Sequence, residues 1–379
     1  DTEFTQTFED GTTWFPTNYG NVVSGGAESA RVALYKSDNL PAVRVYQEMQ
    51  KRSVDVMGYL EKMGFNPAAS YTPEDIKNLA FAIGGVSSGP TVLEETRAFA
   101  TFANNGNYHD GYFIDRIEDA AGNVVFQHQS NPTQVFSEDS NYLMIDMLRN
   151  TMTEGTGRIA KGYMTMGGDW IAKSGISENS KDVWFIASTP SITIGSWIGY
   201  DSRFQNYTIN INDGYGRESE RSQRYWANVV NELYAARPDI FGVDRKFSRP
   251  SSVQETDVLQ QTGTKPGTMR LDNGGTISIT GPTYKDLFKV SHPAPELNYK
   301  FLFGATDEEL ANFWSTYRAQ LEEQRRQEDQ RRQQESSSSS SSSSSSAANE
   351  NPGNGNETPG GNNNNNNQNN NQNNTPGQR

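Results

Sequence analysis

Cysteine is absent from the 379 residues, so the chain can form neither disulfides nor thiolate-based sites. Histidine occurs only as His109, His128 and His292, and no pair has the HExxH spacing of a helical zinc site. We therefore expect no metal and no cofactor. No run of about 18 apolar residues is present, so the sequence predicts no membrane-spanning helix.

Positive charge is also scarce. The sequence has 33 Lys and Arg residues against 46 Asp and Glu residues, which gives a net charge of −13. Proteins that bind nucleic acid need clustered positive charge to neutralise phosphates, so the acidic balance argues against such a function. It equally disfavours electrostatic docking on anionic lipid. The length allows two or three domains with a sizeable core.

Two kinds of periodicity follow one another in the first 235 residues. Apolar residues at helical spacing predict helices at 28–36, 41–49, 53–63, 91–104 and 141–152. Three strand-length segments with short polar turns then predict an antiparallel meander at 169–176, 183–188 and 192–200, before a helix at 225–234. This order predicts an α+β domain in which helices flank one antiparallel sheet.

The remaining sequence predicts a small β-rich domain and a tail. Residues 238–252 have the composition of a linker, and residues 268–290 are rich in Thr, Gly and Val, which predicts a few short strands. A helix is expected from 306 to about 332. From Ser336 onward Ser, Asn, Gly and Pro dominate, which predicts disorder. We thus place one domain at 1–235, a small accessory domain at 236–322, and a polar helix extension with its tail at 323–379.

Two short polar motifs indicate possible chemistry. Ser37-Asp38-Asn39 lies between two predicted helices, where an extended or turn segment directs the hydroxyl and the amide to one side. Lys173-Ser174-Gly175 lies in a predicted strand, where Gly175 lets a substrate approach the backbone and the N–H of Ile176 can face an oxyanion. Acyl transfer needs such hydroxyl, amine and amide groups. Each tripeptide alone also fits a helix cap or a strand edge.

The order and surroundings of these motifs resemble the transpeptidase domain of class A penicillin-binding proteins, the bifunctional peptidoglycan synthases. The resemblance covers about residues 1–235, and residues 236–320 resemble more loosely the small C-terminal domain of streptococcal and enterococcal members. The matching blocks are FPTNY at 15–19, ALYKSDNLPAV at 33–43, AIGG at 82–85, TVLEETRAFATFANNG at 91–106, GTG at 155–157 and the segment 173–200.

The resemblance implies a D,D-transpeptidase that cross-links peptidoglycan stem peptides at the extracellular face of the cytoplasmic membrane. Its partners would be stem peptides of lipid II-derived glycan strands and β-lactam antibiotics. Carried over by position, Ser37 and Lys173 would be catalytic, and Asn39, Ser174 and Gly175 would bind substrate or β-lactam. Ile176 departs from the family, which usually has Thr or Ser there to bind the substrate carboxylate. The lost hydrogen bond is worth about 1.5–3 kcal/mol.

The family's upstream motif, Ser-x-x-Lys, is missing, because no lysine of the sequence has a serine three positions before it. That motif carries the nucleophilic serine. We therefore expect the nucleophile, a membrane anchor and a glycosyltransferase domain on an upstream segment of the same protein. Two alternatives remain open: a non-catalytic cell-wall-binding or scaffold protein with a degenerate penicillin-binding fold, and a secreted serine β-lactamase.

Overall fold

The computed structural model describes residues 1–296 except 26–27, 68, 201–206, 261–262 and 271–273, together with scattered residues between 312 and 333. The chain forms two compact units, Asp1–Ala319 and Gln320–Arg379. The residues described between 312 and 333 are helical, and the predicted disordered tail lies outside the described residues. The division at residue 235 stays a prediction. Within the described part, no helix is long and apolar enough to cross a membrane.

A three-stranded antiparallel sheet forms the centre of the first unit. Its strands follow the chain in the order β7 (Ile171–Ile176), β8 (Asp182–Ser188) and β9 (Thr193–Gly199). The register places Lys173 opposite Ile186 and Gly175 opposite Trp184. The predicted antiparallel meander is therefore confirmed, and its period of two residues sends Lys173 and Ser174 to opposite faces.

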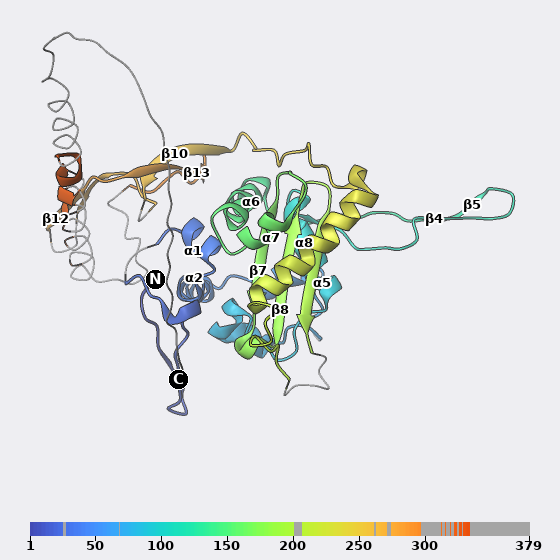
Figure 1. Cartoon of the computed structure of the whole chain (residues 1–379), viewed down its shortest axis with the longest axis horizontal. Helices are drawn as coiled ribbons and strands as arrows, with labels where there is room; N and C mark the ends of the chain where they lie inside the picture. Colours follow the sequence, from blue (N-terminus) through green and yellow to red (C-terminus); the bar gives the residue numbers. More distant parts are fainter. Residues whose placement is uncertain are drawn as a thin grey trace, which may run out of the picture. The chain divides into compact units, whose positions relative to one another are not determined.

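Helices cover both faces of this sheet, as the predicted α+β class requires (Figure 1). Helices α7 (Arg158–Tyr163) and α8 (Glu218–Ala236) lie on one side, and α5 (Val92–Ala103) and α6 (Glu138–Thr153) on the other. The first helix of this group, α5, begins with a capping box formed by Thr91 and Glu94. Helix α8 begins at Glu218, earlier than predicted, and acidic residues favour its first turn.

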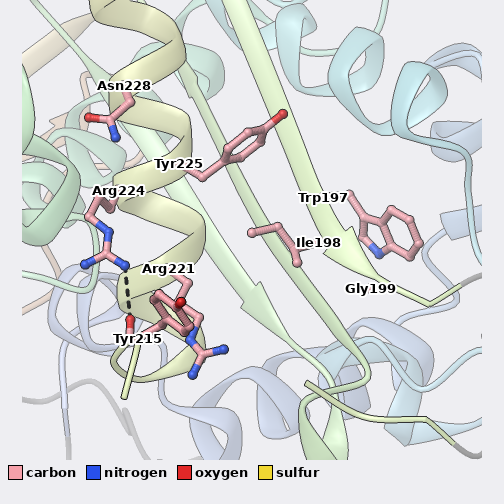
Figure 2. A pocket seen from close by; sticks show the side chains of 8 residues that line it. All are labelled: Trp197, Ile198, Gly199, Tyr215, Arg221, Arg224, Tyr225 and Asn228. Carbon is pink, nitrogen blue, oxygen red and sulfur yellow. Dashed lines mark hydrogen bonds between the residues drawn. The ribbon is translucent and has the colours of Figure 1, made fainter. Parts of the chain in front are cut away.

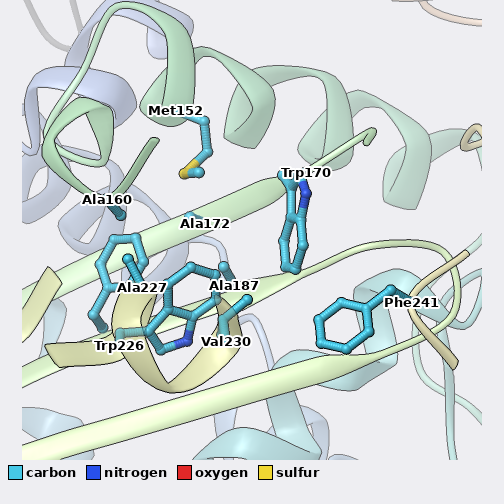
Figure 3. Close-up of a cluster of buried hydrophobic side chains, with 10 residues drawn as sticks. Met152, Ala160, Trp170, Ala172, Ala187, Trp226, Ala227, Val230 and Phe241 are labelled. Atoms are coloured by element: carbon cyan, nitrogen blue, oxygen red, sulfur yellow. The ribbon is translucent and has the colours of Figure 1, made fainter. Parts of the chain in front are cut away.

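The largest buried cluster lies between α8 and the sheet (Figure 3). Trp226, Ala227 and Val230 recur at helical spacing on the inner side of α8 and are at most 1% exposed. The Trp226 ring meets the rings of Trp170 and Phe185 edge to face, with centroids 5.5 and 5.1 Å apart. Its indole N–H donates to the carbonyl of Ile194 at 2.9 Å, so the polar group is satisfied inside the core.

In the described part of the chain four α-helices precede α5, and the first polar motif lies where the first of them ends and the second begins. They are α1 (Ala30–Lys36), α2 (Asn39–Lys51), α3 (Val56–Lys62) and α4 (Pro73–Lys77), followed by the 3-10 turn η2 (Leu79–Ile83). The small pairs are β1 (Gln6–Thr7) with β2 (Thr13–Trp14), β3 (Asn107–Tyr108) with β6 (Thr133–Gln134), and β4 (Arg116–Glu118) with β5 (Val124–Gln127).

Two further antiparallel pairs follow α8 in the region predicted to be β-rich. They are β10 (Val253–Leu259) with β13 (Thr283–Lys289), and β11 (Gly267–Arg270) with β12 (Thr276–Ile279). The predicted segment 268–290 contains three of these strands, but β10 and the exposed β4–β5 hairpin were not predicted. The hairpin is closed by a polar turn in which Asp119 accepts the N–H groups of Ala121 and Asn123.

Substituting Val230 with alanine tests the packing of α8. Val230 is fully buried, so Val230→Ala removes buried methyl groups and leaves a cavity that costs about 2 kcal/mol of unfolding free energy. The neighbouring Val229 is 38% exposed and provides the matched control, Val229→Ala, which we expect to cost under 1 kcal/mol. Urea unfolding followed by tryptophan fluorescence measures both. Equal effects of the two substitutions would contradict this packing.

Candidate active site

The two polar motifs meet in space although 136 positions separate them. The Lys173 Nζ, on β7, donates a hydrogen bond to the Ser37 Oγ at 2.6 Å. A second bond, to the Ser174 carbonyl oxygen at 2.9 Å, holds the amine in place. A hydroxyl and an amine in direct contact form a pair that can pass a proton between them.

Ser37 occupies the left-handed turn that ends α1. Its φ is +64°, and the N–H groups of Ser37 and Asp38 bond to the carbonyls of Leu34 and Ala33. A residue other than glycine costs about 1–2 kcal/mol in this conformation. Glycine would relieve the strain but would lack the hydroxyl that faces Lys173. A strained backbone conformation that is kept at a residue with a needed side chain is typical of a functional position.

The amine of Lys173 has an unusual environment for a lysine. Its side chain is half-buried, and among the described residues no carboxylate forms an ion pair with it. Burial disfavours the charged form and lowers the pKa of Lys173 to about 8. Roughly a tenth of the amine is therefore neutral at pH 7, and a lysine that acts as base or proton relay uses this form.

Ser174 points to the opposite face of β7 and contacts the loop between α6 and α7. Its Oγ donates to the Thr156 Oγ1 at 2.9 Å, and the Thr156 N–H donates to the carbonyl of Tyr35 in α1 at 3.1 Å. A Cβ on Gly155 would lie 2.2 Å from that same carbonyl oxygen, so only glycine fits there. The GTG block thus joins the end of α1 to β7.

Two buried amide side chains hold this arrangement and were not singled out in the sequence. Gln223, 1% exposed, donates to the Thr156 carbonyl at 2.8 Å and accepts the Ala160 N–H at 2.9 Å. Asn18, 2% exposed, accepts the N–H of Leu40 at 3.0 Å at the start of α2. Asn18 lies in the FPTNY block, whose resemblance was the only signal for it.

The remaining predicted site residues lie two or three positions after Ser37 or Lys173 in the sequence: Asn39, Gly175 and Ile176. The Asn39 Nδ2 donates to the Thr17 carbonyl at 2.7 Å, which fixes the orientation of the amide. A Cβ on Gly175 would approach no protein atom closer than 3.6 Å, so internal packing does not require glycine there. The free space is available to a ligand. Ile176 is 38% exposed at the end of β7.

Ser177 does not replace the hydroxyl that Ile176 lacks. The Ser177 Oγ accepts the N–H of Asp182 at 2.8 Å and donates to its carboxylate at 3.2 Å. The residue therefore belongs to the turn between β7 and β8. This agrees with the strand alternation, which directs residues 176 and 177 to opposite sides.

One group of carboxylates lies beside the first motif. Oxygen atoms of Asp1, Glu28 and Asp38 lie within 4.8 Å of one another, as in a possible cation site. Burial and the nearby charge of Glu28 raise the pKa of Asp38. Lys36 pairs with Glu28 at 2.5 Å, and the Asp1 carboxylate accepts bonds from Asn18 and the Ser24 N–H, both at 2.8 Å. Protein groups therefore already bind two of these three carboxylates, and we assign no metal to the cluster.

An open cavity of about 750 Å³ lies between α8 and β9 (Figure 2). Within the described ranges, no strand pairs with the outer edge of β9. The cavity contains none of the predicted site residues and is lined by Trp197, Ile198, Gly199, Tyr215, Arg221, Arg224, Tyr225 and Asn228.

The chain is similar in sequence to known proteins. The family model described as "Penicillin binding protein transpeptidase domain" matches residues 2–234. Penicillin-binding protein 1F of Bacillus subtilis is 31% identical over 202 residues, which are 53% of this chain and 27% of that protein. Penicillin-binding protein 2a of Streptococcus pneumoniae is 26% identical over 261 residues, which are 68% of this chain and 34% of that protein. The chain thus spans about a third or less of these relatives.

Solved structures show the same fold at low sequence identity. Penicillin-binding protein 1A from Haemophilus influenzae aligns with a TM-score of 0.62 and 19% identity, covering 79% of this chain and 45% of that one. The penicillin-binding protein PonA1 from Mycobacterium tuberculosis aligns with a TM-score of 0.52 and 19% identity, covering 65% and 64%. The predicted fold class is confirmed by this likeness.

The lowered pKa of Lys173 predicts a specific pH dependence of stability. The unfolded chain keeps this proton up to the ordinary value of 10.5, whereas the folded chain releases it near 8. Between these values the unfolded state binds more protons, so unfolding free energy rises with pH. Relative to Lys173→Met, the wild type should gain up to about 1.4 kcal/mol per pH unit in this window. A constant difference from pH 8 to 10 in urea unfolding would contradict the assignment.

Proposed function

Because the chain belongs to the penicillin-binding protein transpeptidase family, we propose that it forms the proton-transfer and substrate-binding side of a D,D-transpeptidase site. The observation that carries this proposal is the contact between the Lys173 amine and the Ser37 hydroxyl. The substrates would be peptidoglycan stem peptides, and β-lactams would acylate the same site. No cofactor takes part in the proposed reaction.

In this proposal a serine Oγ attacks the carbonyl carbon of the penultimate residue of the stem peptide. The new C–O bond forms an acyl-enzyme as the C–N bond to the terminal residue breaks. The neutral Lys173 amine takes the proton of the attacking serine by way of the Ser37 hydroxyl and returns it by the same route to the departing amine. The N–H of Ile176 stabilises the developing oxyanion, and Asn39 holds the peptide group of the substrate. An acceptor amine of a second stem peptide then attacks the acyl carbonyl and releases the serine.

We further propose that the nucleophilic serine lies outside these 379 residues, on an upstream segment of the same protein. Two observations support this: the sequence has no Ser-x-x-Lys, and β9 has an outer edge without a partner strand in the described part of the chain. Exposed strand edges are normally covered or paired. The complete protein would then be a class A enzyme of a Gram-positive coccus, anchored by that segment at the outer face of the cytoplasmic membrane.

Covalent labelling tests the location of the nucleophile. We expect a fluorescent penicillin to leave no covalent band on this chain alone in a denaturing gel, because its sequence has no Ser-x-x-Lys. The same protein extended upstream through its Ser-x-x-Lys segment should be labelled, with the adduct on that serine. A label mapped to any serine among these residues would refute the assignment. An extended protein without Ser-x-x-Lys would favour the scaffold alternative.

Restoring a hydroxyl at position 176 tests the role of Ile176. In the extended protein, Ile176→Thr regains a hydrogen bond to the ligand carboxylate worth about 1.5–3 kcal/mol, so β-lactam acylation should accelerate by roughly 10- to 150-fold. Ile176→Val is the matched control, because it has the same branching without the hydroxyl. Stopped-flow measurement of the acylation rate constant compares them. Equal rates for both variants would show that position 176 does not contact the carboxylate.

A further inference from the structure

Arg31 links the helix of the first motif to the antiparallel pair β10–β13, called the C-terminal sheet below. It lies in the first turn of α1, and its Nε donates to the Asp286 Oδ1 of β13 at 3.0 Å, with a second bond from Nη2 to the same oxygen. The two side chains are 14% and 13% exposed. A charged pair buried to this degree is strongly disturbed when one partner is removed, because the other is left without compensation.

The same guanidinium also holds α1 to α6. Its Nη2 donates to the Asp146 Oδ2 at 2.6 Å and its Nη1 to the Asn150 Oδ1 at 2.5 Å. Asp286 is itself oriented, because the Tyr284 hydroxyl and the Leu287 N–H each donate to it at 2.8 Å. Arg31 therefore lies in a fixed position between two helices and one strand of the C-terminal sheet.

Helix α1 carries this constraint to the candidate active site. Ser37 follows Arg31 by six positions, which is about 9 Å along a helix. At the C-terminal end of α1 the Tyr35 carbonyl accepts a hydrogen bond from the Thr156 N–H at 3.1 Å. The Ser37 hydroxyl accepts one from the Lys173 amine at 2.6 Å. A short helix held at its first turn and at its last turn has little freedom to rotate. If Arg31 loses its partners, we therefore expect the contact between Ser37 and Lys173 to loosen.

We propose that Asp286 of the C-terminal sheet is a positioning residue that, through Arg31, holds α1 so that Ser37 stays against Lys173. The C-terminal sheet then helps to set the geometry of the site rather than only adjoining it. The geometric part of this proposal stands on the contacts alone, and its catalytic meaning rests on the proposed transpeptidase function.

A second ion pair from the same strand provides the matched control. Lys289 of β13 contacts Asp139 of α6 at 3.1 Å. This pair also ties β13 to α6, but it does not touch α1. If the site responds only to weaker attachment of the C-terminal sheet, substitutions of Asp286 and of Lys289 should disturb it equally. If the effect passes through Arg31, only substitution of Asp286 should disturb it.

The first test uses this chain and amide hydrogen exchange measured by NMR. In Asp286→Asn we expect amide exchange at Ser37 and Asp38 to accelerate at least tenfold, and the titration midpoint of Lys173 to change. In Lys289→Met we expect both quantities to stay as in the wild type. Asp286→Glu, which keeps the charge, should recover most of the protection. If Asp286→Asn does not fold, Arg31→Lys is measured instead and should show the same local loss. Equal effects of the Asp286 and Lys289 variants, or unchanged exchange, would overturn the proposal.

The second test measures acylation by a β-lactam in the protein extended through its Ser-x-x-Lys segment. Asp286→Asn should slow the acylation step at least tenfold and change the dissociation constant of the initial complex less than twofold. Loosened exchange with unchanged acylation would refute the catalytic role of Asp286. Absence of acylation in the wild type would instead count against the proposed function, while the exchange measurement would still decide the positioning of α1.

Discussion

The site depends on a lysine that is buried without a carboxylate partner. Because Lys173 has only hydroxyl and carbonyl oxygens as hydrogen-bond partners in the described structure, burial lowers its pKa to about 8 and its neutral form becomes accessible. An acidic partner would stabilise the charged form and remove this property. The rest of the fold serves to maintain that environment, since β7 lies between helices on both faces and Ser37 covers the amine.

The parts of the fold that the sequence predicts are those determined by local patterns. The period of two residues in 169–200 predicts the three central strands, and Thr91 with Glu94 predicts the start of α5. The α+β class follows from the order of these elements. The β4–β5 hairpin escaped prediction because its strands are short and exposed, so no buried face imposes an apolar alternation.

The parts of the site that the sequence does not predict arise from contacts between distant segments. Ser37 adopts a left-handed backbone conformation because it caps the end of α1. The residues next to it in the sequence do not predict this conformation. Gln223 and Arg31 look like ordinary polar helix residues in the sequence. Their roles depend on Thr156 and Asp286, which lie 67 and 255 positions away. The order of the motifs along the sequence resembles that of a known family, so the motifs are visible in the sequence. The contact between Ser37 and Lys173 joins residues 136 positions apart, so it is visible only in the folded structure.

Replacing Lys173 in the protein extended through its Ser-x-x-Lys segment tests the central claim most directly. Intact-mass spectrometry follows the rate at which a β-lactam adduct accumulates on the wild type and on Lys173→Ala. If Lys173 and Ser37 transfer the proton, the adduct should form at least about 100-fold more slowly in the variant, while the fold and the Ser-x-x-Lys segment stay intact. An unchanged rate of adduct formation would contradict the account.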